Sequence, residues 1–262
     1  MKFITATITT AILAGNALAA PGGSGLAARL EARGVLTRQS VPKINNPDEV
    51  NGVLLKEGSS SAKIQYSKNW AGIVREQPPA SGTYNVVSAT FTVPDPTATD
   101  DSGDTQAASA WTGIDAYVSN GDQKSFDAWY EWYPNPAENF QIDLTAGDVI
   151  VATVMSNSPS EGVAIIENKS SGKSVTKTLS APSTSATLGG QNAEWIVEDF
   201  NSGSSMVPLA NFGVISFTGA QAKAGDSEYG INDGSILDIQ QNGQVLAHVE
   251  VESDTEFTVT YQ

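Results

Sequence analysis

The chain has 262 residues, no cysteine and a single histidine, and its formal net charge is −15. This excess of acid excludes nucleic acid and anionic membranes as expected partners, because both would repel it. The lack of cysteine excludes disulfide and thiol chemistry, and one histidine, His248, gives little support for a Ser-His-Asp triad or a His-ligated metal site, so we expect neither a metal nor another cofactor.

Residues 1–20 have the pattern of a secretory signal peptide. Lys2 is followed by an apolar run and by Ala17-Leu18-Ala19, a small-residue cleavage site. The run is shorter than the roughly 18 to 20 apolar residues of a transmembrane helix, and no later stretch of the sequence reaches that length. We therefore predict a secreted, extracellular protein without a membrane partner.

Residues 21–62 lack strand-like alternation and carry several basic residues, so we interpret them as a basic propeptide or linker. From residue 63 onward, 8 Lys and Arg face 25 Asp and Glu, a net charge of −17. The negative charges of such a domain are expected to repel each other less as its carboxylates protonate, which favours an acidic medium. The alternative is that the negative charge only keeps a secreted protein soluble. We hypothesise that the basic residues between Arg29 and Lys43 pair with cleft carboxylates at neutral pH and release them in acid.

Residues 63–262 have an all-β pattern. Short runs rich in Val, Ile, Thr and Phe alternate with Gly, Pro, Asn and Ser clusters, and helical periodicity is almost absent. Turns at Asn120-Gly121, Ser171-Gly172 and Asn242-Gly243 predict hairpins. So many strands in one domain favour a β-sandwich with two packed sheets.

The sequence contains one N-glycosylation sequon, Asn168-Lys169-Ser170. It lies beside the predicted Ser171-Gly172 turn, and a turn at the surface would tolerate a sugar. The sequence does not say whether a sugar is attached.

Two segments combine carboxylates with aromatic residues in strand-like alternation. They are Asp127-Ala-Trp-Tyr-Glu-Trp-Tyr-Pro134 and Ala193-Glu-Trp-Ile-Val-Glu-Asp-Phe200. Because a buried carboxylate costs several kcal/mol unless it has a partner, we expect these strands to line a cleft. The alternation predicts one face with Asp127, Trp129, Glu131 and Tyr133, and it places Trp195 and Val197 in the core.

Paired carboxylates also suggest glycoside hydrolysis. Residues four apart on one strand, such as Asp127 and Glu131, lie about 13 Å apart, beyond the ~5 to 9.5 Å that glycosidases use. A cross-strand pair of Glu131 with Glu198 keeps a glycosidase or lectin open as a less favoured hypothesis.

Four ordered motifs resemble those of the fungal glutamic peptidases, the eqolisins. The motifs are Asn69-Trp-Ala-Gly72, Trp111-Thr-Gly-Ile-Asp115, and the two acidic-aromatic segments at 127–134 and 193–200. Together they extend over about Tyr66 to Gln262, and the signal peptide and basic pro-segment fit the same family.

The resemblance implies a secreted acid endopeptidase with a concanavalin A-like β-sandwich of two large antiparallel sheets. It implies a Glu and a Gln as the catalytic pair, without a metal, and protein or peptide substrates; we take a monomer as the default. Glu198 matches the catalytic Glu, which activates water and later protonates the leaving amine, while the Gln stabilises the oxyanion. Positions that match residues lining or supporting the cleft are Trp70, Trp111, Asp115, Asp127, Trp129, Glu131 and Tyr133.

The chain departs from the family where the catalytic Gln is expected. Only residues 116–126 connect Asp115 to Asp127, and they predict a compact hairpin with Gln123 near its tip. Gln106 and Gln191 lie near other motifs, but neither has family-like surroundings. Losing one oxyanion donor typically costs about a hundredfold to a thousandfold in rate. The first hypothesis is therefore an active peptidase, whose working form is this chain or a longer transcript of the same gene. The alternative is an impaired or inactive peptidase-like binding module.

Overall fold

A computed structural model describes residues 38–39, 41–45, 64–100, 105–110, 114–119, 123–202 and 204–262. The predicted signal peptide, most of the predicted pro-segment, Trp111 and the Asn120-Gly121 turn lie outside these residues. For the strand at 114–119, which includes Asp115, and for Gln123, only the backbone is described. The described part contains no helix long and apolar enough to cross a membrane.

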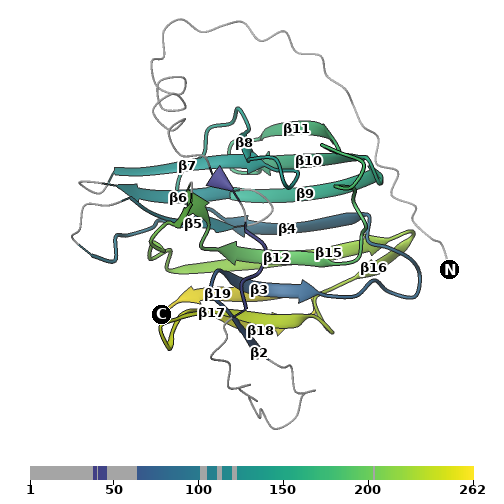
Figure 1. Ribbon diagram of the computed structural model, residues 1–262. Helices are drawn as coiled ribbons and strands as arrows, with labels where there is room; N and C mark the ends of the chain where they lie inside the picture. The colour runs from purple at the N-terminus through teal and green to yellow at the C-terminus, as the bar shows by residue number, and fades with distance from the viewer. Residues whose placement is uncertain are drawn as a thin grey trace, which may run out of the picture. The chain divides into compact units, whose positions relative to one another are not determined.

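Most strands belong to one large, mainly antiparallel sheet (Figure 1). Its strands follow in the order β11 (Lys173–Ser180), β10 (Glu161–Asn168), β9 (Val149–Ser158), β4 (Val86–Thr92), β15 (Val214–Ala224), β19 (Glu256–Tyr261), β18 (Gln244–Ser253), β17 (Ser235–Gln241), β3 (Trp70–Arg75), β12 (Ala193–Glu198), β5 (Gln106–Ala110), β6 (Ile114–Ser119), β7 (Gln123–Tyr130) and β8 (Glu138–Asn139). β16 (Ser227–Tyr229) adds to β15, and β2 (Ile64–Ser67) adds to β17 in parallel. A small second sheet contains β1 (Arg38–Gln39), β13 (Asn201–Ser202) and β14 (Ser205–Met206).

The long strand β15 connects the two halves of the large sheet, the half from β11 to β4 and the half from β19 to β8. Its first part, Val214 to Phe217, pairs with β19, and its second part, from Thr218, pairs with β4. The ladder shifts register after Thr218, where Gly219 has φ +58°, a conformation that glycine adopts without strain. The all-β prediction is confirmed, but the two layers expected from the sequence are joined into one curled sheet, a half-barrel.

The hydrophobic core lies between the two halves of the curled sheet. Phe91 of one half packs against Phe217, with ring centroids 5.4 Å apart, and Phe217 stacks on Phe257 at 4.6 Å. Trp195 is fully buried, and its indole N–H donates across the core to the carbonyl of Ser88, at 3.0 Å. The predicted core positions Trp195 and Val197 are both confirmed.

The predicted hairpins are present wherever their turns are described. Between β17 and β18, Asn242 and Gly243 both have positive φ, as a two-residue hairpin turn requires. The expectation that a sugar would be tolerated at Asn168 does not fit its burial, because its side chain is 1% exposed. Its amide donates to Asp148 Oδ2, at 2.8 Å, and its oxygen accepts from the backbone N–H of Ser171, at 2.9 Å. Asn168 therefore fixes the β10–β11 turn from inside.

Candidate functional site

The register of five strands places a row of polar and aromatic residues across one face of the sheet. Glu198 on β12 is opposite Trp70 on β3 and opposite Ser109 on β5. Ser109 is in turn opposite Asp115 on β6, and Asp115 is opposite Asp127 on β7. Directly opposed residues of an antiparallel pair lie on the same face. The register thus aligns three predicted cleft positions, Trp70, Asp115 and Asp127, with Glu198.

β12 separates this face from the core by strand alternation. Trp195 and Val197 point into the core, while Glu194, Ile196 and Glu198 share the other face. On that face Ile196 belongs to a second apolar cluster, together with Trp70, Val74 and Leu237. Glu198 is therefore a fully buried carboxyl at the border of an apolar patch.

Glu198 contacts the segment 41–45, which lies within the predicted propeptide. The backbone N–H of Val41 donates to Oε1 of Glu198, at 2.9 Å. Asn69, from the first motif, holds the same segment with both ends of its amide: Nδ2 donates to the Val41 carbonyl, at 3.1 Å, and Oδ1 accepts the N–H of Ile44, at 2.9 Å. The Ile44 carbonyl accepts from the N–H of Lys68. A peptide backbone is thus hydrogen-bonded to the site.

A basic side chain of this segment reaches the same face. Lys43 Nζ donates to Gln65 Oε1, at 2.9 Å. Burial raises the pKa of Glu194 to about 7, and the positive charge of Lys43 opposes that shift. Asn192 also donates to Glu194 Oε1, at 2.7 Å. One of the four basic residues hypothesised to face cleft carboxylates is therefore placed near one of them.

Asp199, the residue after Glu198, is a buried carboxyl that sequence reasoning did not select. It is 2% exposed, and burial raises its pKa to about 7, against the hydrogen bond from Gln241 Nε2 to its Oδ2, at 2.8 Å. Gln241 Nε2 also donates to the Lys68 carbonyl, at 2.8 Å. The sequence feature that could have identified Asp199 was the acidic pair Glu198-Asp199, next to Phe200 in the acidic-aromatic segment 193–200.

The first acidic-aromatic segment is only partly a strand. Asp127 and Trp129 are buried on β7, but β7 ends at Tyr130 and the turn that contains Pro134 follows. The predicted alternation is therefore wrong beyond Tyr130: Glu131 lies past the strand and Tyr133 is 54% exposed. β7 is three strands away from β12, so Glu131 and Glu198 are not cross-strand neighbours. The carboxylate pair that a glycosidase hypothesis needed is not formed.

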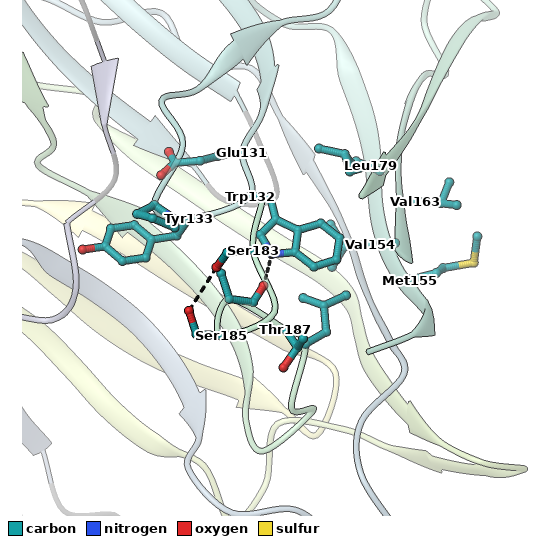
Figure 2. A pocket seen from close by; sticks show the side chains of 15 residues that line it. Glu131, Trp132, Tyr133, Val154, Met155, Val163, Leu179, Ser183, Ser185 and Thr187 are labelled. Carbon is teal, nitrogen blue, oxygen red and sulfur yellow. Dashed lines mark hydrogen bonds between the residues drawn. The ribbon is translucent and has the colours of Figure 1, made fainter. Parts of the chain in front are cut away.

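A cavity of about 600 Å³ lies beside this turn (Figure 2). Glu131, Trp132 and Tyr133 form one side, and aliphatic side chains of β9, β10 and β11 form another. Trp132 is fixed there by a hydrogen bond from its indole N–H to the Ala186 carbonyl, at 2.6 Å. The motif thus contributes to a partly apolar hollow as well as to the polar row.

The three glutamines considered as partners of Glu198 lie elsewhere. Gln106 is on β5, three residues before Ser109, and its side chain is bonded to Thr99 and Asp100. Gln191 is exposed and donates to the Gly189 carbonyl. Gln123 begins β7 at the hairpin end, opposite Ser119, as expected. β6 is hydrogen-bonded directly to β7, so no other strand lies between them.

The side chain beside Glu198 is instead Ser109, which sequence reasoning missed. Ser109 is fully buried, and its hydroxyl has no hydrogen-bond partner among the described residues. The only sequence signal was its position two residues before Trp111. Within the described residues, no group of three His, Cys, Asp or Glu side chains is placed to hold a metal ion.

Comparisons with known proteins agree on one family. A model described as the Peptidase A4 family matches residues 68–261. Aspergillopepsin-2 of Aspergillus niger is 39% identical over 291 positions, 29 more than this chain has residues, and both chains are covered completely. Scytalidopepsin B of Scytalidium lignicola is 32% identical, over 97% of this chain and 98% of that protein. The crystal structure of scytalido-glutamic peptidase with a peptide-based transition state analogue matches with TM-score 0.61 and 30% identity, over 74% of this chain and 98% of that one.

Proposed function

Because this chain belongs to the Peptidase A4 family, the glutamic peptidases or eqolisins, we propose that it is a secreted acid endopeptidase that hydrolyses peptide bonds with Glu198 and without a metal. One observation carries the proposal: the backbone N–H of Val41 is 2.9 Å from Oε1 of Glu198. A peptide amide thus lies at the carboxyl, where the leaving nitrogen of a substrate would be protonated.

In this mechanism the ionised Glu198 is the general base. It takes a proton from water while the water oxygen bonds to the carbonyl carbon of the substrate. The same carboxyl then returns the proton to the amide nitrogen as the C–N bond breaks. Because Glu198 is buried among Trp70, Val41 and the sheet, substrate rather than bulk water would surround it during the reaction.

We assign residues 1–20 to a signal peptide, 21–62 to a propeptide and 63–262 to the peptidase domain. The contacts of Val41 with Glu198 and of Ile44 with Asn69 support this assignment, because they put part of the propeptide on the proposed catalytic group. Substrate could reach Glu198 only after this segment leaves. The enzyme would therefore be made as a zymogen.

We propose that the row with Glu198, together with the far end of β7, forms the substrate cleft. Trp70, Asp115 and Asp127 share the row, and the remaining proposed cleft residues are Trp111, Trp129, Glu131 and Tyr133. The substrates would be proteins and peptides, as the peptide-based analogue bound to a relative suggests. We also propose that the fold is similar to the concanavalin A-like sandwiches and that the protein is a monomer.

A second candidate is a peptidase-like module that binds peptide without cleaving it. The direct pairing of β6 with β7 favours it, because that pairing leaves no strand for the Gln that the resemblance implies. A lectin or glycosidase is less favoured, since Glu131 and Glu198 are not neighbours.

The test is cleavage of denatured protein at about pH 3 to 4, where carboxylates titrate. The full chain is incubated in acid to allow processing and compared with its Glu198→Gln variant, with pepstatin present against contaminating aspartic proteases. Activity lost in the variant supports the peptidase. If neither chain cleaves the substrate but both still bind peptide, the result supports the binding module.

A further inference from the structure

The proposed hydrolysis needs a hydrogen-bond donor for the oxygen that becomes negative, and Ser109 is placed to supply one. Ser109 is the register partner of Glu198 across the β5–β12 ladder. Side chains of such a pair lie on one face, with Cβ atoms about 4.5 to 5.5 Å apart. On its other side Glu198 has Trp70, which belongs to the apolar cluster with Val74, Ile196 and Leu237.

In the part of the chain that the structure describes, the buried Ser109 hydroxyl has no hydrogen-bond partner. Burying a hydroxyl in this way costs free energy that an alanine would not cost, and Ala108 and Ala110 occupy the neighbouring positions of the same strand. An alanine at position 109 would therefore stabilise the folded state at least as well as the serine does. A donor kept unbonded next to a catalytic carboxyl is available for a ligand oxygen.

We propose that Ser109 donates a hydrogen bond from Oγ to the carbonyl oxygen of the scissile peptide, in the role that a Gln side chain has in the family. The inference rests on the proposed function. When water attacks the carbonyl carbon, its proton goes to Glu198 and the negative charge goes to the carbonyl oxygen, which accepts the Ser109 O–H bond. The Ser109 proton stays on Ser109. When the intermediate collapses, the electron pair of the oxyanion re-forms the C=O bond, the C–N bond breaks, and the leaving nitrogen takes the proton held by Glu198.

The experiment compares the acid-processed full chain with its Ser109→Ala, Ser109→Thr and Glu198→Gln variants. Cleavage of a peptide substrate gives kcat and KM at about pH 3 to 4, and urea unfolding gives stability. Ser156→Ala is the control, because it removes a half-buried serine hydroxyl on β9, far along the sheet order from β5.

We expect Ser109→Ala to lower kcat by about a hundredfold to a thousandfold, the usual effect of losing one oxyanion donor, with little change in KM. Ser109→Thr keeps a hydroxyl and should recover at least about tenfold of that loss. Stability should not fall in Ser109→Ala, since the lost hydroxyl had no partner. A neutral donor also leaves the pH at which activity falls unchanged.

Three results would overturn the inference. If Ser109→Ala keeps kcat while Glu198→Gln is inactive, the peptidase stands and Ser109 is not its donor. If Ser109→Ala unfolds or loses stability, the hydroxyl is structural. If the unaltered chain does not cleave under conditions where it is processed and folded, the proposed function fails as well, because a competent base and donor would give turnover.

Discussion

At the scale of single residues, Asp199 links the site to pH. Burial raises its pKa to about 7, whereas an unfolded Asp titrates near 4. Between these values the folded chain holds a proton that the unfolded chain has lost, so the free energy of unfolding falls as pH rises from about 4 to 7 and is largest below that range.

We expect Asp199→Asn to remove this part of the pH dependence, because an amide does not ionise. The change between about pH 4 and pH 7 should shrink by up to about 4 kcal/mol, the upper bound for a shift of this size. Urea unfolding at three pH values measures it, with Asp226→Asn, at an exposed turn, as the control. Equal slopes for Asp199→Asn and the unaltered chain would contradict the assignment.

Asn168 is the second residue with a testable role. Its side chain bonds Asp148 and the Ser171 amide, both at the base of the β10–β11 turn. Asn168→Ala should lower the free energy of unfolding by about 1 to 3 kcal/mol, because it removes the hydrogen bonds that a buried amide makes to half-buried Asp148 and to the backbone N–H of Ser171. Asn157→Ala, which removes an exposed side-chain bond to Glu161, should change stability much less, and similar losses of Tm in both would argue against a buried network.

At the scale of elements, strand β3 depends on a close approach to β12. Gly72 has φ +150°, and a Cβ there would lie 2.0 Å from the Trp195 carbonyl oxygen. Gly72→Ala should therefore destabilise the chain by clearly more than about 1 kcal/mol, as strain in a buried backbone does. Gly82→Ala is the matched control, since Gly82 also has positive φ but its Cβ would meet nothing within 4 Å. Equal melting temperatures for the two variants would show that β3 and β12 can separate.

The segment 41–45 behaves as an element of the site, and its contacts depend on carboxylates. Glu194, with a pKa raised by burial to about 7, loses its attraction for Lys43 as it protonates. A labelled peptide of residues 21–62 should therefore bind the acid-processed chain more tightly near neutral pH than at about pH 4.

Lys43→Ala in that peptide should reduce this difference, measured by fluorescence anisotropy. Asn45→Ala is the control, because Asn45 is exposed and contacts Ser67 through its backbone. Binding that is equally tight at both pH values would refute the role of the carboxylates.

At the scale of the whole molecule, local rules in the sequence predicted what depends on neighbours along the chain. Alternation placed Trp195 in the core, and Asn242-Gly243 predicted its hairpin. Alternation failed beyond Tyr130, because a turn that includes Pro134 ends the strand. The position of Ser109 beside Glu198 depends on the register of two strands separated by about 90 residues in the sequence. Likewise, no local pattern pairs Val41 with Glu198, 157 residues away.

The shared strand β15 has a consequence for how the molecule comes apart. Strand β15 is hydrogen-bonded to both halves of the sheet. If either half unfolds together with β15, backbone groups of the other half lose their hydrogen-bond partners. Domains linked by a flexible connection melt in separate steps, whereas this arrangement couples the halves into one cooperative unit. Amide hydrogens of β4 and of β19 should then exchange through the same global opening, with equal dependence on denaturant. The secreted peptidase that we propose would resist attack by other proteases better if neither half of its sheet unfolds alone.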